Sequence, residues 1–221
     1  MQAIDHRTIT LPSGVRLDYA ECGKGPATLF LHGYTDSWRS FEPVLTRMPG
    51  DVRSLAFSQR GHGDSDKPES FGIESLAADA VGFMDALGID EAVVVGHSMG
   101  GLVAQEVALA HEWRVTRLVL VGTADTFDVP LARELGRAVG ELDDPVPREF
   151  ALEFQASTIH SVVSDDFLNM VVRESMKVPA RIWRDALAAQ VGFLSRDRLS
   201  LLTVPTLIVW GDHDQGRQPA L

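Results

Sequence analysis

The sequence predicts an α/β fold. We expect a doubly wound, mostly parallel sheet covered by helices, with an antiparallel hairpin at its start and a helical insertion near its end. Short runs of β-branched and aliphatic residues, typical of strands buried on both faces, recur at residues 27–31, 93–95 and 115–121. A helical pattern at residues 73–87 precedes the second run, and this alternation of strands and helices specifies right-handed crossovers within one sheet.

The first residues favour a hairpin at the edge of the sheet. Residues 8–11 and 15–22 are extended segments, and Pro12-Ser13-Gly14 between them forms a turn-rich break. Because parallel strands cannot be joined by so short a connection, these two strands are predicted to be antiparallel. Residues 27–31 then form the first buried strand, which ends at His32-Gly33-Tyr34.

The next segment is predicted to contain a helix at residues 37–48 and a short strand at residues 52–57. Turn-forming residues fill the segment 58–68 that follows. We interpret this segment as a solvated loop, because His62 within it has no second metal ligand at a useful spacing.

Residues 93–101, with the sequence Val-Val-Val-Gly-His-Ser-Met-Gly-Gly, are predicted to form a buried strand, a sharp turn and the start of a helix. The G-x-S-x-G spacing lifts Ser98 clear of the sheet, and Gly96 and Gly100 let the strand and helix backbones approach closely. The helix N-terminus favours negative charge at this point. A chance Gly-Ser turn or a phosphate loop is the alternative. Since no lysine follows the glycines, we interpret Ser98 as a nucleophile.

A glycine beside such a nucleophile can direct a backbone amide into the cleft. Gly33 ends the strand 27–31, so the amide of Tyr34 is a candidate oxyanion donor, together with the amide of Met99 that follows the serine. Taken alone, Gly33 is explained equally well as a plain turn residue. Paired with the turn at Ser98, the oxyanion interpretation is favoured.

Several candidate residues follow the carboxyl ends of predicted strands. His32 and Ser98 do so, and Asp125 comes shortly after the strand 115–121. Ligands of doubly wound sheets bind at this edge, so we expect the three residues to lie near a binding cleft.

Residues 126–202 carry helical patterns in place of strand patterns. We predict that they form a helical lid inserted into a core of residues 1–125 and 203–221. Strand signals vanish there. Four segments mix apolar and charged faces, at residues 131–139, 150–157, 167–176 and 180–191. Each large apolar residue of the lid more often packs it against the core, but as a set they favour a small-molecule substrate with an apolar part. The set comprises Phe150, Phe154, Phe167, Met170, Met176, Trp183 and Phe193.

A last buried strand is predicted at residues 204–210, and it ends at Gly211-Asp212-His213-Asp214. A carboxylate at this strand end could orient an imidazole and stabilise its charged form. Capping of a turn explains one of the two aspartates, Asp212 and Asp214, well. It explains the presence of both less convincingly.

Composition excludes several classes of function. The chain holds 20 basic and 31 acidic residues, a net charge of −11, which disfavours binding to nucleic acid or to an anionic membrane. No dinucleotide-binding glycine pattern is present, and we expect no cofactor and no metal. The single cysteine, Cys22, and the lack of a signal pattern or of a long apolar run predict a cytoplasmic protein.

Together these motifs resemble the α/β-hydrolase superfamily, in particular its lid-bearing, esterase- and haloperoxidase-like serine hydrolases. The resemblance runs from Arg7 to Asp214. It implies that Ser98 is the nucleophile and Asp214 the triad acid, with Asp212 a poorer match and Asp125 a substitute. It also disfavours dehalogenases and epoxide hydrolases, which use a carboxylate nucleophile in this family. The motifs that carry it are His32-Gly33, Arg60-Gly61-His62-Gly63-Asp64-Ser65, Gly96-His97-Ser98-Met99-Gly100-Gly101, and Val204-Pro205-Thr206 with Gly211-Asp212-His213-Asp214.

The sequence departs from the family after Asp214. The family order is serine, acid, histidine, yet no histidine follows Asp214, and the expected final strand, base-bearing loop and last helix are absent from the sequence. His213 is only a weak candidate base. Two hypotheses remain: an ester-cleaving serine hydrolase, and a catalytically impaired or ligand-binding protein of the same fold.

The strand 204–210 would then lack a neighbour. Its apolar side chains Leu207, Val209 and Trp210 would be poorly covered, at a cost of about 1.5–3 kcal/mol each. We therefore expect a chain that is marginally stable alone, or that pairs through this sheet edge with another copy or with a complementing fragment.

Overall fold

The computed structural model describes residues 2–69 and 72–214 of the 221-residue chain. Within them, seven strands form one sheet in the order β1-β2-β4-β3-β5-β6-β7. Neighbours from β4 to β7 are parallel, while β2 runs antiparallel to both β1 and β4. The predicted fold class is confirmed. The strands are β1 (Asp5–Thr10), β2 (Arg16–Cys22), β3 (Ala27–Leu31), β4 (Arg53–Phe57), β5 (Ala92–His97), β6 (Val115–Val121) and β7 (Thr206–Val209).

The N-terminal hairpin forms one edge of the sheet, as predicted. Asp5 pairs with Glu21 at one end of the β1–β2 ladder and Thr10 with Arg16 at the other. At the turn, the amide of Leu11 donates to the carbonyl of Val15. The strand β1 begins three residues earlier than the sequence pattern indicated, and most of its side chains are exposed, as suits an edge strand.

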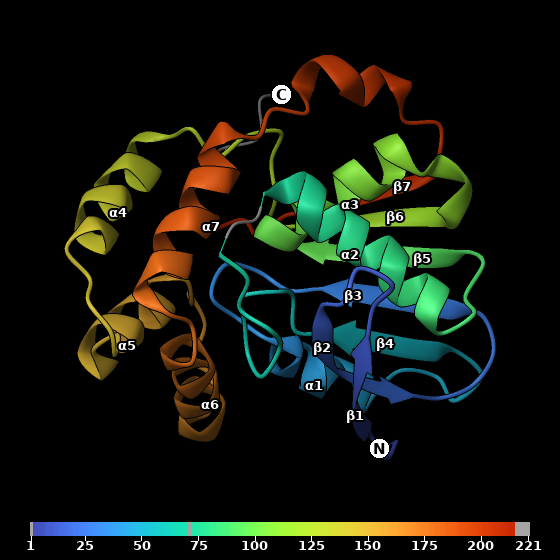
Figure 1. The fold of residues 1–221 in the computed structure, drawn as a ribbon, viewed down its shortest axis with the longest axis horizontal. Coiled ribbons are helices and arrows are strands. Elements are labelled where there is room, and N and C mark those ends of the chain that lie inside the picture. Colours follow the sequence, from blue (N-terminus) through green and yellow to red (C-terminus); the bar gives the residue numbers. More distant parts are fainter. Residues whose placement is uncertain (1, 70–71, 215–221) are drawn as a thin grey trace.

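Helices cover both faces of the sheet. The helices α2 (Ile73–Ala86) and α3 (Met99–Ala110) lie side by side on one face (Figure 1). On the other face, the 3₁₀ turn η1 (Trp38–Phe41) and the short helix α1 (Glu42–Leu45) close a smaller core. The helix predicted at residues 37–48 is therefore much shorter than expected. Pro43 explains the difference, because proline is accepted in the first turn of a helix and not further inside it.

The segment 58–68 is not the solvated loop that the sequence indicated. His62 is fully buried, and the guanidinium of Arg60 makes two hydrogen bonds to the buried carboxylate of Asp79 on α2. The interpretation was wrong because turn-forming residues indicate irregular backbone, and they say nothing of what packs over it. This segment also contacts the loop after β3, where the amide of Gln59 donates to Nε2 of His32.

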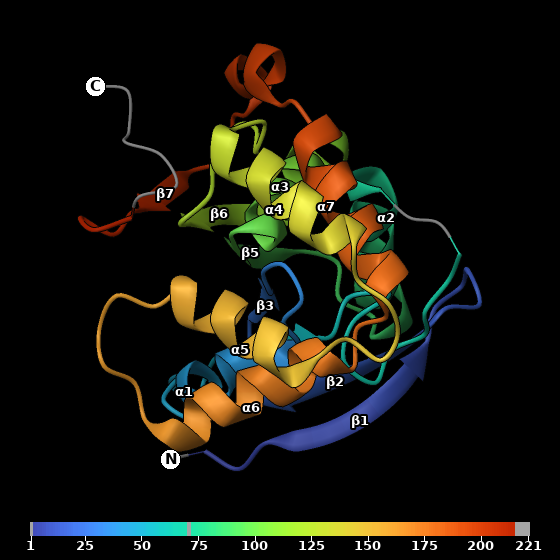
Figure 2. The same ribbon diagram turned by 90° about the vertical axis from the view of Figure 1, so that its left-hand side faces the viewer.

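Residues 126–202 are helical where described, as predicted. Between β6 and β7 the chain forms α4 (Pro130–Gly140), α5 (Arg148–Ser157), α6 (Asp165–Met176), α7 (Ala180–Gly192) and the 3₁₀ turn η3 (Arg196–Leu201). In Figure 1 the helices α4 to α7 gather at the end of the sheet where the chain leaves β6. Figure 2 shows α5 and α6 side by side below α4 and α7. This helical segment therefore stands over the carboxyl ends of the parallel strands.

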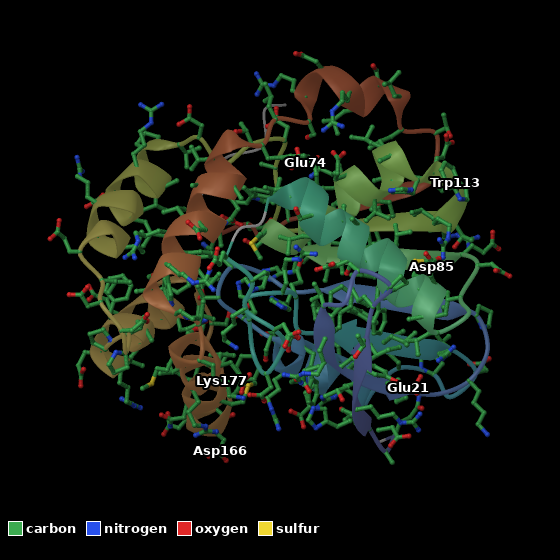
Figure 3. All side chains as sticks on the ribbon, in the orientation of Figure 1. Glu21, Glu74, Asp85, Trp113, Asp166 and Lys177 are labelled. Carbon is green, nitrogen blue, oxygen red and sulfur yellow. The ribbon has the colours of Figure 1, made fainter. Side chains whose placement is uncertain are left out.

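Polar contacts fix the helical segment to the rest of the fold. Lys177, labelled at the end of α6 in Figure 3, pairs with Asp64 at 2.8 Å and with Glu174 at 3.0 Å. The guanidinium of Arg181 donates to the carbonyls of Lys67 and Pro68. These contacts join α6 and α7 to the segment 58–68.

The strand β7 is the outer strand on the side opposite the hairpin. It pairs with β6 from Leu118–Thr206 to Val121–Val209. Its side chains are exposed on both faces: Leu207 is 58% exposed and Ile208 is 67% exposed. Exposure of Leu207 and Val209 agrees with the expectation for an uncovered edge, whereas Trp210 is half-buried.

No helix in residues 2–69 and 72–214 is both long enough and apolar enough to span a bilayer.

Candidate active site

The backbone at Ser98 is strained in the way that the G-x-S-x-G spacing predicts. β5 ends at His97, α3 begins at Met99, and Ser98 between them has φ of 51° and ψ of −120°. Non-glycine residues rarely adopt positive φ, and a residue held there costs about 1–3 kcal/mol. The amide of Ser98 donates to the carbonyl of Val121 at 3.0 Å, which ties the turn to β6.

The glycines around Ser98 allow backbone contacts that no side chain would permit. A Cβ atom built on Gly96 would lie 2.3 Å from the carbonyl oxygen of Gly100, and one on Gly100 would lie 2.1 Å from that of Leu31. At Gly101 the same atom would lie 2.4 Å from a methyl group of Thr123. The N-terminus of α3 is thus pressed onto the ends of β3 and β5.

The loop after β3 lies directly beside the serine. A Cβ built on Gly33 would lie 3.3 Å from Cβ of Ser98. His32 holds this loop in place: its Nδ1 donates to the carbonyl of Gly33 at 2.8 Å, and its Nε2 accepts from the amide of Gln59 at 2.9 Å. The structure therefore brings the candidate oxyanion segment, Gly33 and Tyr34, to the turn at Ser98.

Two buried histidines support this loop as neutral imidazoles. The rings of His32 and His62 meet edge to face at 5.1 Å. Burial lowers the pKa of His32 well below its ordinary value, and burial lowers the pKa of His62 from 6.5 to about 4. Both side chains lie in the sequence motifs of the site, yet they serve as supports for the backbone.

These low pKa values predict a loss of stability in mild acid. The unfolded chain gains a proton at His62 as the pH falls below 6.5, whereas the folded chain gains it only near pH 4. In that window the free energy of unfolding should fall by about 1.4 kcal/mol per pH unit for this group. Urea unfolding of the wild type and of His62→Gln between pH 7 and pH 4 measures it. The variant should lose part of the slope, and the exposed His160→Gln should keep it; equal slopes in all three proteins would contradict the prediction.

Asp214, in the segment after β7, lies near Gly122 at the end of β6. A Cβ built on Gly122 would lie 3.7 Å from Oδ2 of Asp214 and 3.9 Å from Nε2 of His97. A small cavity of about 40 Å³ adjoins this point, lined by Asp214, Gly122, Phe127 and Trp210 among others. The carboxylate of Asp214 therefore lies close to the imidazole of His97, the residue before Ser98.

The other candidates lie elsewhere. Asp212 and His213 are exposed, and the ring of His213 stacks on that of His160 at 4.0 Å. The carboxylate of Asp125 pairs with the guanidinium of Arg196. Asp214 thus lies beside Gly122 and near His97, whereas Asp125 is paired with Arg196 and His213 is stacked on His160.

Sequence reasoning missed Asp36, whose carboxylate lies inside the site. Its Oδ2 would be 3.4 Å from a Cβ on Gly33, and its Oδ1 accepts from Nε2 of Gln155 on α5 at 3.0 Å. Burial raises the pKa of Asp36, while the nearby imidazole of His97 lowers it. A polar residue just after a strand-end glycine was the only signal available. The hydroxyl of Ser175 on α6 extends this contact. It accepts a hydrogen bond from Nε2 of Gln155 at 2.8 Å and donates one to the carbonyl of Thr35 at 3.2 Å.

Three of the seven apolar lid candidates gather around Tyr34. The rings of Tyr34, Phe154 and Trp183 contact one another edge to face at 5.3–5.4 Å, and Phe150 packs on Trp183 at 5.4 Å. The hydroxyl of Tyr34 donates to the carbonyl of Trp183 at 2.5 Å. An aromatic cluster from α5 and α7 therefore sits against the candidate oxyanion loop.

No group of three or more His, Cys, Asp or Glu side chains suited to a metal ion occurs in the described part of the chain.

Comparison with known proteins identifies the fold family. The family model of the alpha/beta hydrolase fold matches residues 26–219. The bifunctional epoxide hydrolase 2 of Mus musculus is 31% identical over 178 residues, which are 70% of this chain and 32% of that protein. The chain thus spans about a third of this curated relative.

Solved structures share the fold. The enol-lactonase from Burkholderia xenovorans superposes with a TM-score of 0.82 at 23% identity, over 97% of this chain and 84% of that one. The bromoperoxidase from Bacillus anthracis superposes with a TM-score of 0.81 at 22% identity, over 94% of this chain and 82% of that one. The chain belongs to the alpha/beta hydrolase fold family.

Proposed function

We propose that this chain is a carboxylesterase-like serine hydrolase, which cleaves a carboxylic ester or a related small acyl substrate through an acyl-enzyme on Ser98. The observation that carries the proposal is the strained backbone of Ser98 at the N-terminus of α3, directly beside Gly33. Such strain persists only where the surrounding structure enforces it, and it is a feature of functional sites. Here the serine side chain begins beside a loop that could offer a backbone amide.

The surrounding groups suit acyl transfer. When the serine oxygen attacks a carbonyl carbon, negative charge develops on the carbonyl oxygen, and preorganised donors lower the barrier. The amides of Tyr34 and Met99 are the proposed donors, aided by the dipole of α3. Asp214 is the proposed acid, which stabilises the charge of a protonated base.

The nucleophile favours an ester over an epoxide. The curated relative from Mus musculus is named an epoxide hydrolase. By the family resemblance such enzymes attack with a carboxylate, and this chain has a serine at that position. The solved structures of similar fold include an enol-lactonase and esterases. We therefore place the chain with the enzymes that attack carbonyl carbon.

The aromatic cluster at Tyr34, Phe154 and Trp183 supports a substrate with an apolar part. We propose that residues 126–202, which contribute Phe154 and Trp183, act as a lid over the site.

A second candidate function is a catalytically impaired or ligand-binding protein. It is favoured by one observation: among the described residues, Ser98 has no hydrogen bond to an imidazole. The two functions are separated by assaying a short-chain aryl ester and an aryl epoxide with the wild type and with Ser98→Ala. Ester turnover that depends on Ser98, without epoxide turnover, supports the hydrolase. Ester turnover at background level in both proteins would leave the ligand-binding function.

We also propose that β7 pairs with another strand, either from a second copy of the chain or from a complementing segment. Its open edge carries the exposed Leu207 and Ile208 and no charged residue, whereas the opposite edge strand β1 carries Asp5 and Arg7. Charged residues are a common means of keeping an edge strand unpaired.

A lysine in β7 tests this proposal. Ile208→Lys should shift the chain to monomer in sedimentation velocity at concentrations where the wild type self-associates, because a charge then lies in the edge. Thr8→Lys, at the opposite edge, is the matched control and should leave association unchanged. A wild type that is monomeric throughout would contradict pairing between copies.

A further inference from the structure

The turn of residues 33–36, which contains the candidate oxyanion donor, has a strained backbone. The amide of Asp36 donates to the carbonyl of Gly33 at 3.3 Å and closes the turn. Thr35, its third residue, has φ of 58°. Glycine is the usual residue where a turn needs positive φ, and a β-branched residue held there is an outlier. In the described part of the chain, Ser98 is the only other non-glycine residue with positive φ.

The carbonyl that closes this turn also orients the candidate oxyanion donor. The carbonyl of Gly33 and the amide of Tyr34 belong to one peptide unit, which is planar. That carbonyl accepts hydrogen bonds from the amide of Asp36 and from Nδ1 of His32. An opening of the turn therefore removes a bond that orients the amide of Tyr34.

Two helices of the inserted segment bond the second half of the turn. The carbonyl of Thr35 accepts from the hydroxyl of Ser175, in the last turn of α6, at 3.2 Å. The carboxylate of Asp36 accepts from Nε2 of Gln155 on α5 at 3.0 Å. The same Nε2 donates to the hydroxyl of Ser175 at 2.8 Å. These bonds form one network across α5, α6 and the turn.

A third helix bonds the first half of the turn. The hydroxyl of Tyr34 donates to the carbonyl of Trp183 on α7 at 2.5 Å, and the two rings meet edge to face at 5.4 Å. Residues 34, 35 and 36 are thus bonded by α7, α6 and α5 in turn. Each successive residue of the turn has a partner on a different helix.

Burial makes this network effective in holding the turn. Thr35 and Ser175 have no exposed surface, and Gln155 is 5% exposed. A buried polar group that loses its partner is not solvated by water, so breaking one of these bonds is costly. The helix α6 is also fixed elsewhere, because Lys177 pairs with Asp64. Removing one hydroxyl from the network therefore frees the turn without detaching the helix.

Building on the proposed hydrolase function, we propose that Ser175 and Gln155 are positioning residues, which hold the oxyanion donor through the turn of residues 33–36. They touch no reacting atom. As the serine oxygen bonds to the carbonyl carbon, the carbonyl electron pair moves onto oxygen. An amide of Tyr34 that is already fixed donates to that oxygen without reorganisation. The lid thereby supports the oxyanion hole as well as covering the site.

The first test is hydrolysis of a short-chain aryl ester by the full 221-residue chain. Ser175→Ala and Gln155→Met remove the hydroxyl and the amide of the network. Each should lower kcat by about 10-fold or more, less than the about 10²–10³-fold that loss of a whole oxyanion donor costs. KM should change little, because neither side chain belongs to the aromatic cluster and the interaction at issue strengthens only in the transition state.

Ser164→Ala is the matched control on the same helix. The hydroxyl of Ser164 accepts from the amide of Phe167 and caps the N-terminus of α6, at the end opposite Ser175. Its loss should lower the thermal stability of the protein, because a helix cap is removed. The control should nevertheless keep wild-type kcat, since the turn of residues 33–36 is untouched.

A second substitution separates positioning from a general loss of stability. Glycine adopts positive φ without strain, so Thr35→Gly removes the need for a bond that holds the backbone there. Added to Ser175→Ala, it should raise kcat above that of Ser175→Ala alone, although it restores no contact with α6. A folded double variant that is no faster than Ser175→Ala overturns the proposed role.

Amide exchange at Asp36, followed by NMR, tests the turn without catalysis. This amide closes the turn, so its exchange should be severalfold faster in Ser175→Ala and Gln155→Met than in the wild type. Ser164→Ala should exchange it at the wild-type rate. Equal rates in all four proteins would show that the helices do not hold the turn, and would overturn the proposal.

The outcomes separate this proposal from the one on which it rests. If the wild type does not hydrolyse the ester, or if Ser98→Ala hydrolyses it equally well, the hydrolase function fails, and exchange at Asp36 alone decides whether the helices hold the turn. If hydrolysis depends on Ser98 while Ser175→Ala and Gln155→Met keep wild-type kcat, the positioning role is overturned and the function stands.

Discussion

Ser98→Ala is expected to reduce hydrolysis of a short-chain aryl ester by about 10³-fold or more. The variant removes the only oxygen that can form the acyl-enzyme at this turn, while the amides of Tyr34 and Met99 stay in place. KM should change little, because the substitution leaves the proposed apolar binding residues of the lid untouched. Steady-state kinetics on both proteins measures the effect.

Ser157→Ala is the matched control for that measurement. Ser157 lies at the exposed end of α5, and its hydroxyl donates to the carbonyl of Phe154 at 2.7 Å. The control should keep wild-type kcat. If Ser98→Ala kept it as well, hydrolysis would not pass through Ser98, and the site would have to be sought elsewhere.

Gly100→Ala is expected to prevent folding or to lower the free energy of unfolding by more than about 4 kcal/mol, out of a total of about 5–15 kcal/mol for a typical protein. The new Cβ would lie 2.1 Å from the carbonyl oxygen of Leu31 and 2.6 Å from that of His32. Both are backbone atoms of β3 and its loop, so no side chain can rotate to relieve the contact. Urea unfolding, together with the yield of folded protein, measures the loss.

Gly140→Ala provides the comparison. Gly140 is the last residue of α4, and a Cβ there would meet no atom within 4 Å. That substitution should leave stability unchanged or raise it by about 0.4–1 kcal/mol, because alanine has fewer conformations to lose on folding. Equal stabilities of the two variants would show that the turn at Ser98 is not packed as described.

Local sequence patterns predicted the parts of the fold that depend on local chemistry. The hairpin at Leu11 and Val15 and the turn at Ser98 follow from turn residues and from apolar periodicity, and both are present. The helix expected at residues 37–48 was too long, because a periodic apolar pattern continued past Pro43, which limits where a helix can begin.

The candidate site was only partly predictable. Ser98 and Gly33 stand in motifs with a steric reason for each residue, so the sequence alone singles them out as candidates. Asp36 carries no such signal, because its proximity to His97, 61 positions away, arises only in the fold. Burial of His62 and the pairing of Arg60 with Asp79 depend likewise on helices that pack over the segment.

The bond between Asp36 and Gln155 joins residues 119 positions apart, one in the loop beside Ser98 and one on α5. Burial raises the pKa of Asp36 as long as α5 stays in place. In the proposed hydrolase, a movement of α5 away from this loop would admit water to the carboxylate and remove the amide that Gln155 donates to it. Both changes would alter the protonation of Asp36, so the proposed lid and the charge beside Ser98 would be coupled.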